Sequence, residues 1–98
     1  MPDRRKLSDK KITSALKKLK GWSLRGGKLH KEFTFGDFIG AFGFMTSAAL
    51  VAQTLNHHPE WSNVYNRVVI DLSTHSEGGI TGLDVELAGK LEKIGSPG

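Results

Sequence analysis

The sequence predicts a single α+β domain, in which helices pack on one face of an antiparallel β-sheet. Three observations lead to this fold class. A chain of 98 residues is too short to build two adequate cores. Three segments have apolar residues at helical spacing, and the stretches between them alternate as strands do. The predicted order is helix, hairpin, helix, strand, helix. We expect one domain over residues 1–98, with its core at about 7–95 and flexible termini.

The first helix is predicted over about residues 9–20, because Ser8 is a suitable N-cap and Gly21 a stop signal. Its inner face carries Ile12, Ala15, Leu16 and Leu19. The segment WSLRGGKLHKEFTF then predicts a hairpin that turns at Gly26-Gly27. In its second arm, Leu29, Phe33 and Phe35 alternate with polar residues, so one face should be buried.

Asp37 can cap a long helix that runs to about Asn56. The apolar stripe expected to face the core consists of Phe38, Ala41, Phe42, Met45, Ala48, Ala49, Ala52 and Leu55. Four further apolar residues fall off that stripe, namely Ile39, Phe44, Leu50 and Val51. Because a small domain cannot cover a helix on all sides, this surplus predicts a contact with a second subunit.

The helix is expected to end at His58-Pro59, and one strand is predicted over Asn63–Thr74. Four of its residues should point inward, namely Val64, Val68, Ile70 and Leu72, and three should point outward, namely Arg67, Asp71 and Ser73. Thr81 and Asp84 resemble a capping box that opens the last helix. A three-stranded sheet would leave an edge that invites a second copy of the chain.

Composition excludes several classes of protein. No apolar run approaches the roughly 18 residues that span a bilayer, and the N-terminus lacks the features of a secretory signal. The chain has no cysteine, which rules out disulfides, thiol nucleophiles and cysteine zinc sites. We therefore expect a cytoplasmic protein without a membrane contact.

Charge divides the chain unevenly. Residues 1–31 hold 11 basic and two acidic residues, whereas residues 32–98 hold three basic and eight acidic residues. This asymmetry raises the possibility of an acidic partner. The lysines of the first helix, Lys10, Lys11, Lys17 and Lys18, have only Trp22 as a nearby aromatic residue. We therefore favour a solvated helix face and expect no nucleic-acid partner.

Three of the four histidines bracket the predicted strand, namely His57, His58 and His75. Histidines at a helix end can simply favour the helix dipole. Their clustering at two break points instead favours a site, because histidine exchanges protons near neutral pH. Adjacent histidines diverge too much to chelate one metal ion well, so no metal is expected. There is no G-x-S-x-G elbow and no phosphate-binding glycine loop, and His30 is expected at the surface.

The segment NHHPEWSNVYNRVVIDLSTH, followed by Asp84, resembles the pterin-4a-carbinolamine dehydratases. The family signature aligns with Gln53, His57-His58-Pro59, Tyr65, His75 and Asp84, with gaps of three, five, nine and eight residues. GWSL and FTFGDFIGAFGFMTSAAL are similar to the family as well, so the likeness covers about residues 7–95. Gln53 and Thr54 replace a usual Glu-Lys pair, Asn56 an aspartate and Ser76 an acidic residue, which removes charge from the rim of the site.

The resemblance implies dehydration of 4a-hydroxytetrahydropterin to quinonoid dihydropterin, as part of tetrahydrobiopterin recycling. No cofactor is needed, because the elimination requires only positioned acid–base groups. We expect His57 and His75 to transfer protons and His58 mainly to hold the pterin. The other residues expected to bind substrate are Asn56, Ser73, Thr74, Ser76 and Asp84, with Trp22 and Trp61 as walls for the flat ring.

The resemblance also implies partners. A homodimer or homotetramer is expected, and a pterin-dependent aromatic amino acid hydroxylase would supply the substrate. Some members of the family act as dimerisation cofactors for a homeodomain transcription factor. A non-catalytic adaptor that uses the surface of the helix at 37–56 is therefore the alternative function.

Overall fold

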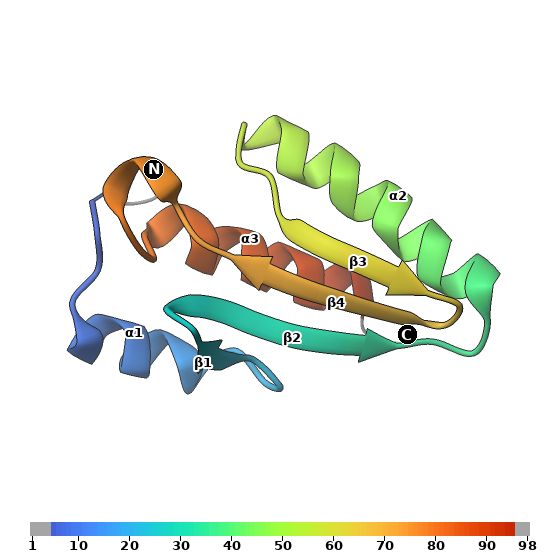
Figure 1. The fold of residues 1–98 in the computed structure, drawn as a ribbon, viewed down its shortest axis with the longest axis horizontal. Helices are drawn as coiled ribbons and strands as arrows, with labels where there is room; N and C mark the ends of the chain where they lie inside the picture. The colour runs from blue at the N-terminus through green and yellow to red at the C-terminus, as the bar shows by residue number, and fades with distance from the viewer. Residues whose placement is uncertain (1–4, 96–98) are drawn as a thin grey trace.

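A computed structural model describes residues 5–95 of the chain, and the ribbon in Figure 1 follows their order. The elements are α1 (Asp9–Leu16), β1 (Ser23–Arg25), β2 (Lys28–Thr34), α2 (Phe38–Thr54), β3 (Glu60–Val64), β4 (Arg67–Leu72), the short 3₁₀-helix η1 (His75–Glu77) and α3 (Gly82–Gly95). The flexible termini predicted from the sequence fall partly on residues 1–4 and 96–98, which lie outside the described residues. No helix within residues 5–95 is long and apolar enough to cross a bilayer.

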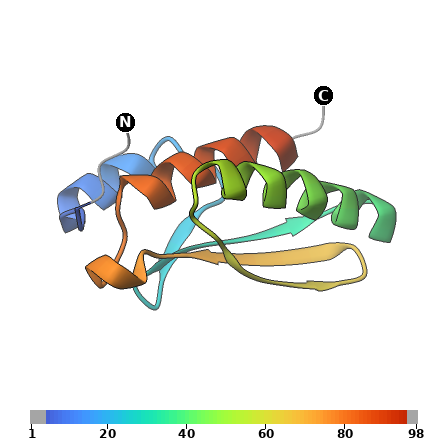
Figure 2. The same cartoon turned by 90° about the horizontal axis from the view of Figure 1, so that it is seen from above.

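The four strands form one antiparallel sheet in the order β1-β2-β4-β3. Figure 2 shows the helices gathered on one face of this sheet, which leaves the other face open. The α+β fold class predicted from the sequence is therefore confirmed. The core lies between the two layers, where Leu29, Ile70, Leu72, Leu87 and Leu91 are fully buried.

The single strand predicted over residues 63–74 is wrong, because this stretch belongs to a hairpin. β3 and β4 pair from Glu60–Asp71 to Val64–Arg67, and Tyr65 and Asn66 form the loop. Tyr65 adopts a left-handed backbone conformation, with φ of +49°. Residues paired directly across a hairpin share one face of the sheet. Val64 therefore lies on the open face with Arg67 and is exposed, instead of pointing inward as predicted. The sheet has four strands and not three.

Helix α2 begins as predicted, with the Asp37 carboxylate accepting a hydrogen bond from the Gly40 amide at 2.8 Å. Its buried face differs from the predicted stripe and consists of Ala41, Phe44, Ala48 and Ala52. Phe44 turns inward because its ring packs 4.7 Å from that of Phe33. Phe38 and Phe42 are half exposed, and Ile39 and Leu50 more so. The predicted surplus of apolar surface on this helix is confirmed.

Helix α1 begins at the predicted cap, where Ser8 accepts a hydrogen bond from the Lys11 amide. It ends at Leu16 and not at residue 20, because the chain tightens into turns with three-residue spacing. The amides of Lys18 and Leu19 donate to carbonyls three residues back. Gly21 then leaves the turn with φ of +84°, a conformation that favours glycine.

Candidate active site

The end of α2 fixes the two adjacent histidines. Asn56 takes a left-handed conformation, with φ of +48°. Its amide donates to the Gln53 carbonyl, and the His57 amide donates to the Ala52 carbonyl. These two bonds form a Schellman motif, which satisfies the last carbonyls of the helix. The motif turns the chain sharply, so that His57 and His58 leave α2 in a defined direction before Pro59.

His57 is held by a buried carboxylate. Its Nε2 lies 2.5 Å from Oδ1 of Asp84, whose side chain is completely buried. The other oxygen of Asp84 accepts hydrogen bonds from the Thr74 hydroxyl at 2.8 Å and the Thr81 amide at 2.9 Å. The Thr81 hydroxyl accepts from the Leu83 amide and lies 2.8 Å from the Thr74 hydroxyl. A buried carboxylate needs such a set of donors to remain charged.

This arrangement confirms the capping box predicted at Thr81 and Asp84, and it has a chemical consequence. Because Asp84 accepts only, the Nε2 of His57 carries the proton that is donated to it. The Nδ1 atom of His57 is therefore the ring nitrogen that can exchange a proton with a substrate. The carboxylate also stabilises the imidazolium that forms when Nδ1 takes up a proton.

The other two histidines are more exposed. His58 places Nε2 at 2.9 Å from the amide oxygen of Gln53, one turn earlier on α2. His75 begins η1, and 80% of its side chain is accessible to solvent. Its Nε2 lies 4.0 Å from Oε2 of Glu60. Thr74 connects the two parts of the site, because its hydroxyl binds Asp84 while the next residue is His75.

A cavity of about 300 Å³ lies between the β1–β2 turn and residues 73–79. Three residues predicted to bind substrate line it, namely Ser73, Thr74 and His75. Ser76 is exposed beside them on η1. Gly26, Gly27 and Lys28 form the opposite wall. The cavity therefore combines predicted site residues with a hairpin that the sequence pattern did not connect to them.

The two tryptophans occupy different places. Trp61 is half-buried on β3 and packs against the core. Trp22 is buried in the core, where its ring makes an edge-on contact with Phe33. Phe33 pairs with Val68, whereas the histidine end of the sheet lies beyond Leu72. Trp22 is thus part of the hydrophobic core.

Four residues of this region were missed as site residues by sequence reasoning: Gln53, Glu60 and Lys28 as partners or neighbours of histidines, and Thr81 as a partner of Asp84. For Thr81 the capping-box pattern was the available signal. Gln53 lies in the predicted family signature, but only the folded chain shows its hydrogen bond. No sequence pattern links Lys28 to residues 60–75, because the sheet alone brings them together.

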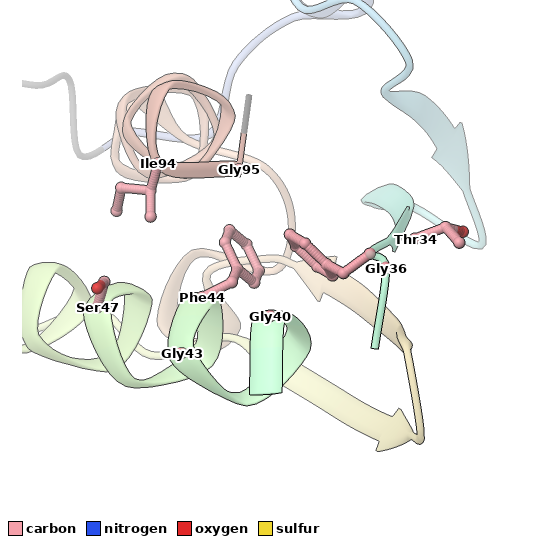
Figure 3. A pocket seen from close by; sticks show the side chains of 9 residues that line it. Thr34, Gly36, Gly40, Gly43, Phe44, Ser47, Ile94 and Gly95 are labelled. Carbon is pink, nitrogen blue, oxygen red and sulfur yellow. The ribbon is translucent and has the colours of Figure 1, made fainter. Parts of the chain in front are cut away.

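A larger cavity, of about 550 Å³, lies at the opposite end of the molecule, between α2, the end of α3 and the end of β2 (Figure 3). Its walls are formed by glycines and by Phe35, Phe44 and Ile94, with Thr34 and Ser47 as the polar side chains. None of these residues is an acid or base near neutral pH. The larger cavity therefore offers no acid–base chemistry, and the histidine end is the candidate active site.

Among residues 5–95, no group of three histidine or carboxylate side chains is placed to hold a metal ion. The arrangement at the histidine end instead suits acid–base chemistry. His57 and His58 have defined hydrogen-bond partners, and His75 lines a small cavity.

Known proteins resemble this chain over most of its length. The family model described as pterin 4 alpha carbinolamine dehydratase matches residues 5–94. A Solibacter usitatus protein that carries the name of this family is 58% identical over 89 residues, covering 91% of this chain and 94% of the relative. A Rhizobium johnstonii protein with the same family name is 51% identical and covers 89% of this chain and 88% of the relative.

A solved structure agrees. The crystal structure of a transcriptional coactivator/pterin dehydratase from Brucella melitensis superposes with a TM-score of 0.91 at 46% identity, and the match covers 94% of this chain and all of the other. These findings confirm the resemblance predicted from the histidine motif, and with it a hydro-lyase activity of the pterin-4a-carbinolamine dehydratase type. The chain belongs to the pterin-4a-carbinolamine dehydratase family.

Proposed function

We propose that His57 and His75 carry out the proton transfers of this dehydration and that His58 helps to hold the pterin. The reaction removes the proton from N5 and the hydroxyl group from C4a, so that a C4a–N5 double bond and one water molecule form. The observation that carries the proposal is the bond between His57 and the fully buried Asp84. It leaves Nδ1 of His57 to accept the N5 proton, because Asp84 stabilises the resulting imidazolium.

His75 is then the acid that protonates the departing hydroxyl group. Its exposed ring lies beside the polar cavity and can regain its proton from solvent. Asp84 acts through His57 and is a positioning residue, because its burial keeps it from the substrate. Contacts of Asn56, Ser73, Thr74, Ser76 and Trp61 with the pterin stay predictions, as does the place of Trp22 in the ring site.

Single replacement of His57 and His75 by alanine tests these roles. Stopped-flow turnover of a chemically prepared 4a-hydroxypterin, corrected for its spontaneous dehydration, should fall about a hundredfold or more in each variant. His58→Ala should mainly raise KM. The matched control is His30→Ala, because His30 pairs with Asp71 on the open sheet face and not with the site. If His57→Ala and His75→Ala keep the wild-type rate, the assignment is wrong.

We also propose that the apolar surface of α2 is covered by further copies of the chain in a homodimer or homotetramer. Ile39, Phe42 and Leu50 supply this surface, and water would otherwise cover more than half of each. Ile39→Asp should lower the mass measured by light scattering, whereas Lys17→Asp on the turn after α1 should not. A wild-type chain that is a monomer at micromolar concentration would refute the proposal.

An adaptor role for the same surface is the second candidate function. The Brucella melitensis protein is described as a transcriptional coactivator as well as a pterin dehydratase, and the exposed side of α2 is the feature that favours such a role here. A pure adaptor would show no turnover above the spontaneous rate, so the stopped-flow assay separates the two. Tetrahydrobiopterin recycling with a pterin-dependent hydroxylase, and a cytoplasmic location, stay predictions.

A further inference from the structure

An ion pair crosses the open face of the sheet beside the active site. Lys28 begins β2 and Glu60 begins β3, with β4 lying between these strands. The Nζ atom of Lys28 lies 2.7 Å from Oε2 of Glu60, and both side chains are partly exposed. The hydrogen bond that Lys28 donates to Glu60 raises the pKa of Lys28 above its usual value of 10.5. Partial loss of hydration lowers this pKa, and the negative charges of Glu60 and Asp71 raise it further. Lys28 is thus a cation throughout the neutral range.

The same carboxylate faces the candidate catalytic acid. Oε2 of Glu60, the atom bound by Lys28, is also the atom that lies 4.0 Å from Nε2 of His75. Lys28 and His75 line the same cavity of about 300 Å³. Glu60 therefore stands between a permanent cation and an imidazole whose protonation the reaction requires. A carboxylate favours the imidazolium form, and the ammonium group beside that carboxylate opposes this preference.

We propose that Lys28 and Glu60 are positioning residues that balance the charge state of His75, an inference that rests on the acid–base role proposed for His75. Glu60 favours a proton on His75 before the hydroxyl group leaves. The positive charge of Lys28 opposes the effect of Glu60, so that His75 can release the proton to the hydroxyl group. Glu60 and Lys28 carry opposite charges, so removing one or the other should change the protonation of His75 in opposite directions.

Other charged groups lie near His75. The side chain of Lys6 lies against Gly79, in the segment that follows η1. His30 on β2 places Nδ1 at 2.8 Å from Asp71 on β4, and Arg25 on β1 lies 3.4 Å from the other ring nitrogen of His30. Glu77 lies on η1 itself. Among the described residues, Glu60 is the carboxylate found within 4.0 Å of the His75 ring. The ion pair of Lys28 and Glu60 is therefore the best placed to influence the protonation of His75.

The test follows the His75 ring by NMR in the full chain, with the resonance assigned from its absence in His75→Ala. Glu60→Gln should move the titration midpoint to lower pH, because the carboxylate that favours the imidazolium is removed. Lys28→Met should move it to higher pH, because the carboxylate is then uncompensated. The pH profile of kcat should move in the same two directions. The matched control is the ion pair of Arg67 with Glu32 on the same sheet face, since Glu32→Gln and Arg67→Met should leave both readouts unchanged.

Opposite shifts in the two variants support the proposal. Equal midpoints, or shifts in the same direction, overturn it, because a merely structural effect has no reason to change sign with the charge removed. Thermal unfolding of each variant verifies that the fold is intact. Failure of the proposed function gives a different result: His75→Ala would then keep the wild-type rate, whatever the NMR titrations show.

Discussion

The Nε2 atom of His57 and the Oδ1 atom of Asp84 lie 2.5 Å apart, although 27 positions separate these residues in the chain. The Asp84 carboxylate lies in the first turn of α3 and reaches the loop that follows α2. The same side chain caps α3 through the Thr81 amide. One buried group thus has two tasks, to begin a helix and to orient an imidazole.

Replacing Asp84 by asparagine should reverse the tautomer of His57. The oxygen of the new amide must face the Thr81 amide and the Thr74 hydroxyl, which leaves its NH₂ group facing His57. Nε2 then accepts a hydrogen bond and Nδ1 carries the proton, so the free nitrogen cannot act as a base. We expect kcat to fall about a hundredfold, with a smaller change in KM. Glu32→Gln, which removes a carboxylate that pairs with Arg67 on the open sheet face, is the control; a wild-type kcat in Asp84→Asn would contradict the predicted orientation of His57.

Asn56 should tolerate glycine but not a β-branched residue. Its φ of +48° is accessible to glycine, whereas valine would be strained there by about 1–2 kcal/mol. We expect Asn56→Gly to retain the urea midpoint and Asn56→Val to lower it. KM in the glycine variant tests the predicted substrate contact separately: a severalfold rise would support a contact between the Asn56 side chain and the substrate, and an unchanged KM would contradict it.

Two glycines of α3 should respond to alanine in opposite ways. A Cβ atom on Gly95 would lie 2.6 Å from the Phe33 ring, within a buried aromatic cluster. Gly95→Ala should therefore lower the free energy of unfolding by about 1–3 kcal/mol. A Cβ atom on Gly89 meets nothing within 4 Å, so Gly89→Ala should raise it by about 0.5–1 kcal/mol. Urea denaturation measures both; equal effects would contradict the close approach of Gly95.

The lysine-rich face of α1 should be dispensable for catalysis. Lys10, Lys11, Lys17 and Lys18 are exposed and lie on α1 or in the turn that follows it. With all four replaced by glutamine, kcat should stay within about twofold of wild type, because the influence of distant exposed charges is screened by salt. Steady-state kinetics at two salt concentrations measures this. A large loss of kcat with an unchanged circular dichroism spectrum would show that this face takes part in function.

The Lys28–Glu60 pair should stabilise the protein only while Lys28 is charged. Because the folded state raises the pKa of Lys28 above 10.5, the contribution is complete below that pH. It is lost as the pH rises through the pKa of the folded state. The melting temperature of the wild type should therefore exceed that of Lys28→Met by a small, salt-sensitive amount at neutral pH, and the difference should shrink as the pH rises above 10.5. A difference that grows with pH would contradict this sign.

Local signals in the sequence predicted the beginnings of the helices well. Ser8, Asp37 and Thr81 each place an oxygen where the first amides of a helix need an acceptor, and this requirement is independent of the rest of the fold. The Gly26-Gly27 turn is local as well, since both residues have positive φ.

The predictions from the sequence were wrong where the same residues were compatible with more than one local structure. The two-residue loop at Tyr65-Asn66 interrupts a run that resembles one strand, and no glycine marks the turn. On α2, apolar residues surround the helix, so its sequence could not determine which side faces the sheet. The packing of Phe44 against Phe33 and Phe35, from another element, determines it.

The candidate site was predictable in its residue types but not in its connections. The three histidines follow from the motif alone. The contact between the buried Asp84 and His57 depends on where α3 begins relative to the end of α2. The placement of Trp22 in the core depends on the pairing of β1 with β2.

The long-range bond between His57 and Asp84 has a consequence for how activity is lost. No short piece of the chain contains the oriented imidazole, because the loop after α2, the end of β4 and the start of α3 must dock before Asp84 can hold it. Contacts so far apart in sequence form in the same cooperative transition as the sheet. Turnover therefore reports on global folding in this protein. A fragment that ends before α3 contains all three histidines but should have no activity.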